Sequence, residues 1–234
     1  MYVILILFIS YKNNRVKQSF LLIFLIGAML SSCSNNGNKA ETGDAQEVEV
    51  VKATAATFST IKDGSYIEWR ASHLGGTQKR FGKVFLKNAE ISVKDGQVAN
   101  AAIVIDMSTL TVESFNEGAA EAGDLGGHLK SGDFFNIGTY PTSTFELTSI
   151  EAAEGDFSSK VTGNLTILDT TKSITFMANV AVSDSEVSIQ SEDFSVNRLD
   201  WGLSYHKEGS EGVPVDYLIA NDMGFTINVT LAKS

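Results

Sequence analysis

Apolar and polar residues alternate along most of the chain after residue 58. Two of the clearest runs begin at Ile67 and at Phe225, where every second residue is apolar for several positions. This period of two is typical of antiparallel strands that bury one face. Turn signals such as Asp95-Gly96 separate the runs, because Asp-Gly supplies the positive φ angles of hairpin turns. Many short strands at this spacing predict an all-β fold, either a sandwich or a barrel.

One segment, residues 113–135, breaks the alternation. Its middle is rich in glycine, and residues 124–135 mix apolar and polar positions without a period of two. We expect a helical turn or a short helix over residues 124–135, as the single helical insertion within 113–135. The rest of the folded chain is expected to consist of strands and turns.

The first 33 residues have the layout of an export signal. A basic patch, KNNRVKQ, precedes the apolar run FLLIFLIGAML, which is too short to span a bilayer core of about 30 Å. The following Leu30-Ser31-Ser32-Cys33 resembles the lipobox of bacterial lipoproteins, whose cysteine is diacylated, for example with palmitate, and becomes the new N-terminus. We therefore expect residues 1–32 to be a lipoprotein signal peptide and Cys33 to carry a lipid. An uncleaved membrane anchor and an unmodified, buried Cys33 are the alternatives.

The next segment, residues 33–57, is small, polar and acidic, and it has no apolar period. Such a composition cannot bury enough apolar surface to order itself. We expect a flexible tether here, leading to a domain that occupies residues 58–234. The whole chain has a net charge of −10, and removal of residues 1–32, with their three basic residues, leaves −13. An acidic chain without a basic cluster excludes nucleic acid as a partner, so contact with a membrane would depend on the Cys33 lipid.

Familiar catalytic and metal-binding signatures are absent from the sequence. It has no G-x-S-x-G elbow, no HExxH motif and no phosphate-binding loop. The three histidines lie in separate segments and Cys33 is the only cysteine, so we expect neither a zinc site nor an intramolecular disulfide. These observations predict a protein that is not an enzyme and holds no cofactor. A hydrolase that uses His128 and Asp133 is the enzymatic alternative.

Five segments of the chain resemble the YceI family, in the same order and at similar spacing. They read IEWRASHLG (67–75), GHLKSGDFF (127–135), YPTSTF (140–145), VTGNLTI (161–167) followed by Thr171-Lys172, and FSVNRLDWGL (194–203). The resemblance covers the chain from about residue 58 to its end. It implies an antiparallel β-barrel of lipocalin-like shape, with a long apolar channel that holds a polyisoprenoid or a similar lipid. Leu168-Asp169-Thr170 replaces the family's common His-Gly, so the resemblance says less about the polar head of the ligand than about the fold.

The candidate ligand-binding residues are those that strand parity and the resemblance together direct into the barrel. The apolar candidates are Ile67, Trp69, Ala71, Ile103, Ile105, Phe145, Leu165, Ile167, Phe176, Phe194, Phe225 and Ile227. His73 shares the parity of Ile67, and Arg198 precedes Trp201 in a polar cluster, so both are candidates for contact with a polar head. An apolar chain would be bound by burial of its surface, at about 25 cal/mol per Å². From periodicity alone, a packed core explains the apolar candidates equally well.

Together these features predict a membrane-anchored periplasmic protein that holds or carries a lipid in a barrel cavity. The expected ligand is a polyisoprenoid, an isoprenoid quinone, a fatty acid or a fatty amide, and a second copy of the chain, forming a homodimer, is a further candidate partner. Ser34 and Asn35 follow Cys33, and the absence of Asp at the second mature position favours the outer membrane, on its periplasmic face. The alternative is a structural or stress-related envelope protein with a packed barrel and no ligand.

Overall fold

A closed series of strand pairings runs through the part of the chain that the computed structural model describes, which comprises residues 38–48, 55–113 and 119–234. The strands are β1 (Asn38–Lys39), β2 (Glu41–Asp44), β3 (Ala56–Ile61), β4 (Tyr66–Ala71), β5 (Arg80–Lys94), β6 (Gln97–Asp106), β7 (Thr142–Ala152), β8 (Ser159–Ile167), β9 (Thr170–Val182), β10 (Glu186–Ser191), β11 (Phe194–Asn197) and β12 (Asp222–Lys233). The helices are α1 (Ala119–Lys130) and four 3-10 turns, η1 (Leu74–Gly76), η2 (Met107–Thr109), η3 (Arg198–Trp201) and η4 (Val215–Tyr217). The expected all-β fold with one short α-helix is confirmed among these residues.

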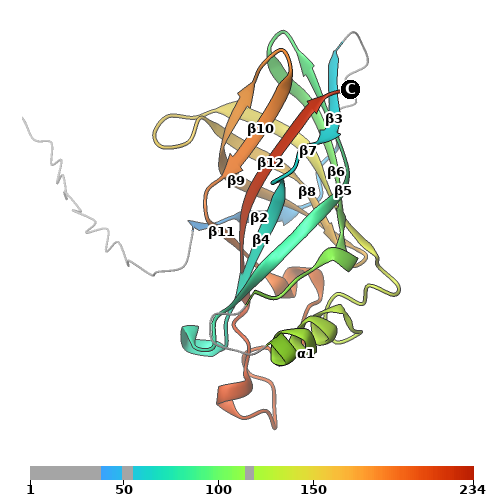
Figure 1. Cartoon of the computed structure of the whole chain (residues 1–234). Coiled ribbons are helices and arrows are strands. Elements are labelled where there is room, and N and C mark those ends of the chain that lie inside the picture. The colour runs from blue at the N-terminus through green and yellow to red at the C-terminus, as the bar shows by residue number, and fades with distance from the viewer. Residues whose placement is uncertain (1–37, 49–54, 114–118) are drawn as a thin grey trace, which may run out of the picture. The chain divides into compact units, whose positions relative to one another are not determined.

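The strands β4 to β10 and β12 close into a ring of eight (Figure 1). Each pairs antiparallel with the next, and β4 closes the ring because it pairs with β5 on one side and with β12 on the other. Strand β3 occupies the same place in the ring as β4, since it also pairs with β12 and β5. The ring is therefore a β-barrel, as the alternation of the sequence and its resemblance led us to expect.

The hairpin between β5 and β6 shows how the turn residues set the strand register. Asp95 and Gly96 adopt φ angles of 53° and 76°, which is the left-handed conformation that a two-residue hairpin turn requires. The flanking residues Lys94 and Gln97 are directly paired. This register places Ile91 and Ile105 on the inner face, where both are buried.

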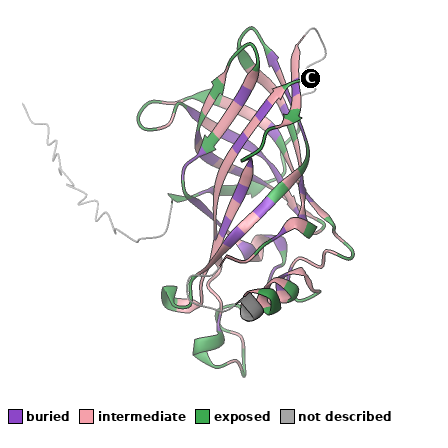
Figure 2. Ribbon diagram, viewed as in Figure 1, coloured by how far each residue is buried: buried purple, intermediate pink, exposed green. Residues whose placement is uncertain are grey.

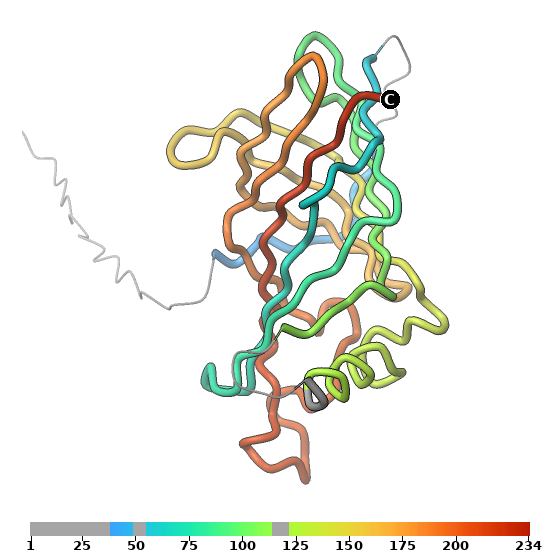
Figure 3. The backbone as a smooth tube through the Cα atoms, in the orientation of Figure 1, coloured from blue at the N-terminus to red at the C-terminus, as the bar shows by residue number. Residues whose placement is uncertain are grey.

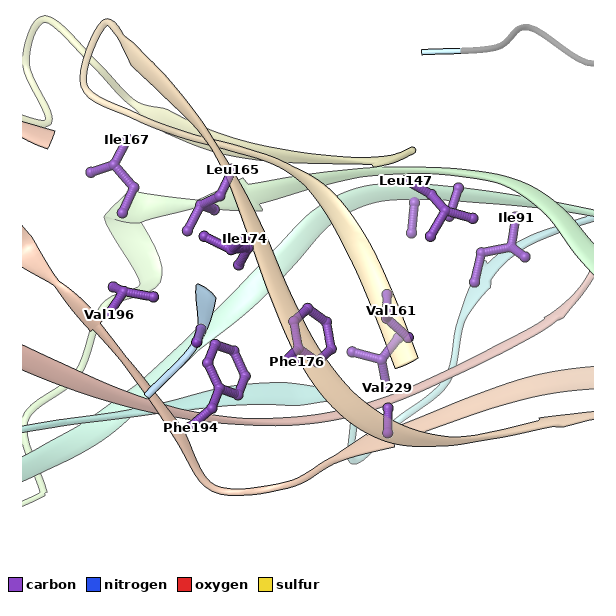
Figure 4. Packing of buried hydrophobic residues seen from close by; sticks show 14 of the residues in the cluster. Ile91, Leu147, Val161, Leu165, Ile167, Ile174, Phe176, Phe194, Val196 and Val229 are labelled. Carbon is purple, nitrogen blue, oxygen red and sulfur yellow. The ribbon is translucent and has the colours of Figure 1, made fainter. Parts of the chain in front are cut away.

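Two groups of buried side chains fill the inside of the barrel and one of its ends. The larger contains residues such as Phe176, Phe194 and Val229 (Figure 4), and the buried positions alternate along the strands (Figure 2). The smaller group joins Trp69 and Met107 to side chains from the α1 region. Trp201 is fully buried, and its indole Nε1 donates to the Leu165 carbonyl at 3.0 Å, which fastens η3 to the barrel wall.

Helix α1 lies within the predicted segment 113–135, but it starts earlier and ends earlier than the expected span of 124–135. It begins at Ala119 and ends at Lys130, and hydrogen-bonded turns follow, in which Phe135 N donates to the Leu129 carbonyl at 3.0 Å. Leu129 and Phe134 are buried. Packing of this apolar face against the barrel outweighs the low helix propensity of the glycines in the segment.

The expectation of a flexible tether over residues 33–57 is wrong for residues 38–48, which we call the N-terminal belt, and for Ala56 and Thr57, which begin β3. Strand β1 of the belt pairs in parallel with β11, and β2 pairs antiparallel with β9 (Figures 1 and 3). Backbone pairing needs no apolar side chains, so the composition of the segment concealed it. Residues 1–32, Cys33, residues 34–37 and residues 49–54 lie outside the described part, so the signal peptide, the lipidation and the rest of the tether stay predictions.

Among the described residues, none of the helices combines the length and apolar character needed to cross a membrane.

Candidate functional site

A cavity of about 170 Å³ lies inside the barrel, and most of the residues that line it are apolar. This space is larger than a single water molecule needs. The lining includes thirteen of the fourteen predicted ligand-binding residues, which are Ile67, Trp69, Ala71, Ile103, Ile105, Phe145, Leu165, Ile167, Phe176, Phe194, Arg198, Phe225 and Ile227. The structure therefore brings them to one cavity, and their binding of a ligand stays a prediction.

Four phenylalanine rings form a chain of contacts across the inside of the barrel. Phe176 stacks on Phe194 with ring centroids 4.7 Å apart, and Phe145 and Phe225 extend the chain at 6.0 Å and 5.9 Å. Gly163 makes room for one of these rings, since a Cβ there would lie 2.3 Å from Phe145 Cζ. The rings offer broad apolar faces to whatever occupies the cavity, which suits an apolar chain and gives a polar one no hydrogen bond.

The buried Arg198 is the cationic residue of the cavity wall. Its Nε donates to the Ala220 carbonyl at 3.0 Å, its Nη2 to the Ile219 carbonyl at 3.2 Å, and its Nη1 to the Leu203 carbonyl. Burial lowers the pKa of this guanidinium, although an arginine keeps its charge in proteins. Since these carbonyls occupy its three nitrogens, Arg198 fastens both ends of the segment 203–220 to the barrel. Its predicted contact with a ligand head stays untested.

A second cavity, of about 500 Å³, lies next to the first at the α1 end of the barrel. The two cavities share a set of lining residues, which are Trp69, Ala71, Leu129, Phe134 and Ile219. The second cavity also has polar groups in its wall, from Ser72, His73 and Arg80. The site as a whole is therefore an apolar chamber that continues into a partly polar one.

His73 is the one predicted residue that the structure places outside the first cavity. Strand β4 ends at Ala71, so the alternation that suggested an inward His73 no longer applies two residues later. Instead, His73 caps η1 and forms a β-bridge with Ile219, and its Nδ1 lies 2.5 Å from the Asp216 carbonyl oxygen. It belongs to the wall of the second cavity.

Sequence reasoning missed two kinds of lining residue. Val84 and Leu147 follow the same strand alternation and were within reach of that signal. Met107, Leu110, Leu129 and Phe134 come from 3-10, loop and helical segments, where no period connects a residue to the barrel interior.

At the same end, Gly82 allows the chain at Thr111 to approach β5, because a Cβ at Gly82 would lie 1.9 Å from the Thr111 carbonyl oxygen. That oxygen accepts a 3.0 Å hydrogen bond from Trp69 Nε1.

The residues of the hydrolase alternative do meet, but neither of them lines a cavity. His128 Nε2 lies 3.0 Å from Asp133 Oδ2, and the His128 ring packs edge-on against Phe134 and Tyr205. Ser131 Oγ donates to the main-chain carbonyl of His128 and not to its ring. In the part of the chain that the structure describes, the pair thus has no hydroxyl nucleophile bonded to it, and the arrangement fixes the turn after α1.

Comparison with known proteins agrees with this architecture. A UPF0312 protein of Pseudomonas paraeruginosa is 32% identical over 131 residues, and a UPF0312 protein of Pseudomonas aeruginosa is 31% identical over the same length. Each alignment covers 55% of this chain, and the chain spans 64% of the length of each relative.

Among solved structures, a polyisoprenoid binding domain from Saccharophagus degradans has the same fold, with a TM-score of 0.55 at 13% identity. The match covers 77% of this chain and all of that one. The family model of the YceI-like domain matches residues 58–231. Through these residues, the chain belongs to the YceI-like family.

Proposed function

We propose that the protein binds one long-chain apolar lipid inside its barrel and carries it at a bacterial membrane. The observation that carries this proposal is the apolar cavity, which thirteen inward-facing residues predicted from sequence line together. Burial of an apolar chain there would supply the binding free energy, at about 25 cal/mol for each Å² removed from water. The description of the Saccharophagus degradans neighbour as polyisoprenoid binding supports the same ligand class.

The ligand we propose is a polyisoprenoid, an isoprenoid quinone, a fatty acid or a fatty amide. All four combine a long apolar chain with a small polar head. The chain would occupy the first cavity, where a polar head would lose its hydrogen bonds to water without replacement. The head would lie in the second cavity, close to Ser72 and Arg80. This orientation places the head beside the polar residues of the second cavity, Ser72, His73 and Arg80.

Native purification tests the proposal directly. We expect protein purified from bacterial membranes in mild detergent to release a single lipid class on solvent extraction. Native mass spectrometry of the same sample should show one added ligand mass for each chain. If extraction yields no lipid, and if added farnesol and palmitic acid both fail to bind, the packed-barrel alternative is correct.

We also propose that a lipid on Cys33 anchors the protein in the outer membrane, on its periplasmic face. Cys33→Ser should remove the acylation site, so we expect the variant to lose the mass of the acyl groups and to leave the membrane fraction or to keep its leader. Ser34→Ala, one position further along, leaves the lipobox cysteine in place and is the control. Detergent partitioning, density-gradient separation of the two membranes and intact mass measure the outcome. An unchanged mass and partition in Cys33→Ser would refute the anchor.

A further inference from the structure

The barrel wall has a break between β9 and β11, and the N-terminal belt fills it. One edge of β9 pairs with β8 along residues 170–178. The other edge pairs with β10 only at residues 178–182, and the residues before this, Lys172 to Thr175, pair with β2. On the far side of the break, β11 pairs with β12 and with β1. The belt is thus a short strand segment between β9 and β11, which do not pair with each other.

The inner side of the belt reaches the apolar interior. Ala40 is 7% exposed and packs in the same cluster as Phe176 and Phe194, both of which line the first cavity. Its backbone N–H donates to the Ser195 carbonyl at 2.8 Å. Ile174, which is paired with Thr42 of the belt, lines the cavity as well. The belt therefore covers the barrel beside the aromatic part of the cavity.

Two buried side chains of the barrel wall form hydrogen bonds with the belt. Glu192 accepts from the Met177 backbone N–H at 2.8 Å with Oε1 and from Asn38 Nδ2 at 2.5 Å with Oε2. Asn164 accepts from the Gln46 backbone N–H at 2.8 Å and donates to the Gln46 carbonyl at 2.7 Å. These side chains provide the hydrogen bonds that a neighbouring strand would otherwise provide. The belt is therefore held at a defined place.

The belt nevertheless buries little of its own surface. Of its residues, only Ala40 is buried, and residues 38–39 and 41–47 are exposed. Its ion pairs, Lys39 with Asp222 and Asp44 with Lys172, are largely open to solvent and so contribute little to its attachment. Segments with little buried apolar surface and exposed hydrogen bonds are those that open without unfolding the rest of a protein.

We propose that the belt can detach from the barrel wall. Its release opens a side entrance between β9 and β11, through which the ligand enters and leaves the cavity. The inference rests on the proposed lipid binding. Release of the belt uncovers Ile174, Phe176 and Phe194, so the opening leads directly to the apolar chamber. The belt lies outside residues 58–231, which the family model matches.

A disulfide clamp across the belt and β9 tests the entrance. Asp44 and Lys172 are directly paired across β2 and β9, so Asp44→Cys with Lys172→Cys should form a disulfide in the full chain. The probe is a dansyl-labelled undecanoic acid, displaced by excess palmitic acid and followed by stopped-flow fluorescence. We expect the oxidised clamp to slow release at least tenfold, and reduction to restore the parent rate.

The matched control is a clamp elsewhere in the wall, Glu151→Cys with Lys160→Cys, which joins the paired strands β7 and β8 and does not involve the belt. We expect it to leave release unchanged. An unchanged rate in the belt clamp would overturn the entrance and would indicate passage through the second cavity. Equal slowing by both clamps would overturn it too, because it would reflect general motion of the barrel. Failure of the parent to bind the probe or a prenyl alcohol would instead remove the lipid-binding proposal itself.

A variant that loosens the belt gives an independent readout in the opposite direction. Asn164→Ala removes both hydrogen bonds to Gln46, so release of the probe should become at least threefold faster while the barrel keeps its circular dichroism spectrum. Asn179→Ala is the control, since Asn179 bonds to the loop between β7 and β8, at Asp156 and Ser158, and not to the belt. Release that is no faster in Asn164→Ala than in Asn179→Ala would count against the proposal.

Discussion

Replacing Arg198 with alanine is expected to lower the free energy of unfolding by about 3–5 kcal/mol, which corresponds to a fall in Tm of roughly 10 °C for a domain of this size. The guanidinium donates to the carbonyls of Leu203, Ile219 and Ala220 in a buried position. Each carbonyl left buried without a donor costs about 1–3 kcal/mol. Both ends of the segment 203–220 would lose their attachment to the barrel at once. Urea unfolding followed by tryptophan fluorescence measures the change.

The control is the same substitution at a partly exposed arginine. Arg70 pairs with Glu68 at 2.7 Å and with Asp193, and its side chain is 29% exposed. Surface ion pairs of this kind are worth about 0–1 kcal/mol, so Arg70→Ala should destabilise the protein far less. Arg198→Lys should give an intermediate loss, because one ammonium group cannot span the three carbonyls that the planar guanidinium reaches. Equal losses in Arg198→Ala and Arg70→Ala would mean that Arg198 does not hold the segment.

Filling the junction of the two cavities should abolish most ligand binding and leave the fold intact. Ala71 lines both cavities, so a phenylalanine there would occupy space that the ligand chain uses. Displacement of two or three methylene groups, at about 0.8 kcal/mol each, amounts to about 2 kcal/mol. We therefore expect Ala71→Phe to bind the dansyl-labelled probe about 30-fold more weakly than the parent. The added ring should cost little stability, because it enters an existing space.

The matched control is Ala102→Phe, the same change on the exposed outer face of β6. It should change neither affinity nor stability, so it separates the effect of position from that of size. The packed-barrel alternative predicts a different pattern. In that case Ala71→Phe would lose roughly 1–3 kcal/mol of stability through overpacking, and the parent would show no affinity to lose.

The period of two was sufficient to predict an all-β fold and twelve apolar residues of the cavity wall. Successive side chains of a strand point to opposite faces, so fixing Trp69 inside also fixes Ile67 and Ala71. The same rule failed at His73, because parity has no meaning beyond the end of β4 at Ala71. It was also silent on Leu129 and Phe134, whose place in the wall depends on how α1 packs on the barrel.

The belt was beyond sequence reasoning for a different reason. Its attachment depends on backbone groups and on wall residues far away in the chain, such as Glu192 and Asn164. The sequence of a polar and acidic segment does not show whether such hydrogen-bonding partners exist elsewhere in the fold. Arg198 is similar, since its three acceptors are main-chain oxygens that no sequence pattern marks.

The belt also covers strand edges that would otherwise be open to other chains. The backbone groups of β9 and β11 beside the break are a template for any extended segment, and the best match to them is the belt of a second copy. Two molecules that exchanged belts would make the same contacts as before and would become a dimer. Within one molecule, a short connection holds the belt at an effective concentration of about millimolar. Exchange between two molecules therefore competes with pairing inside one molecule only where the local protein concentration is also about millimolar.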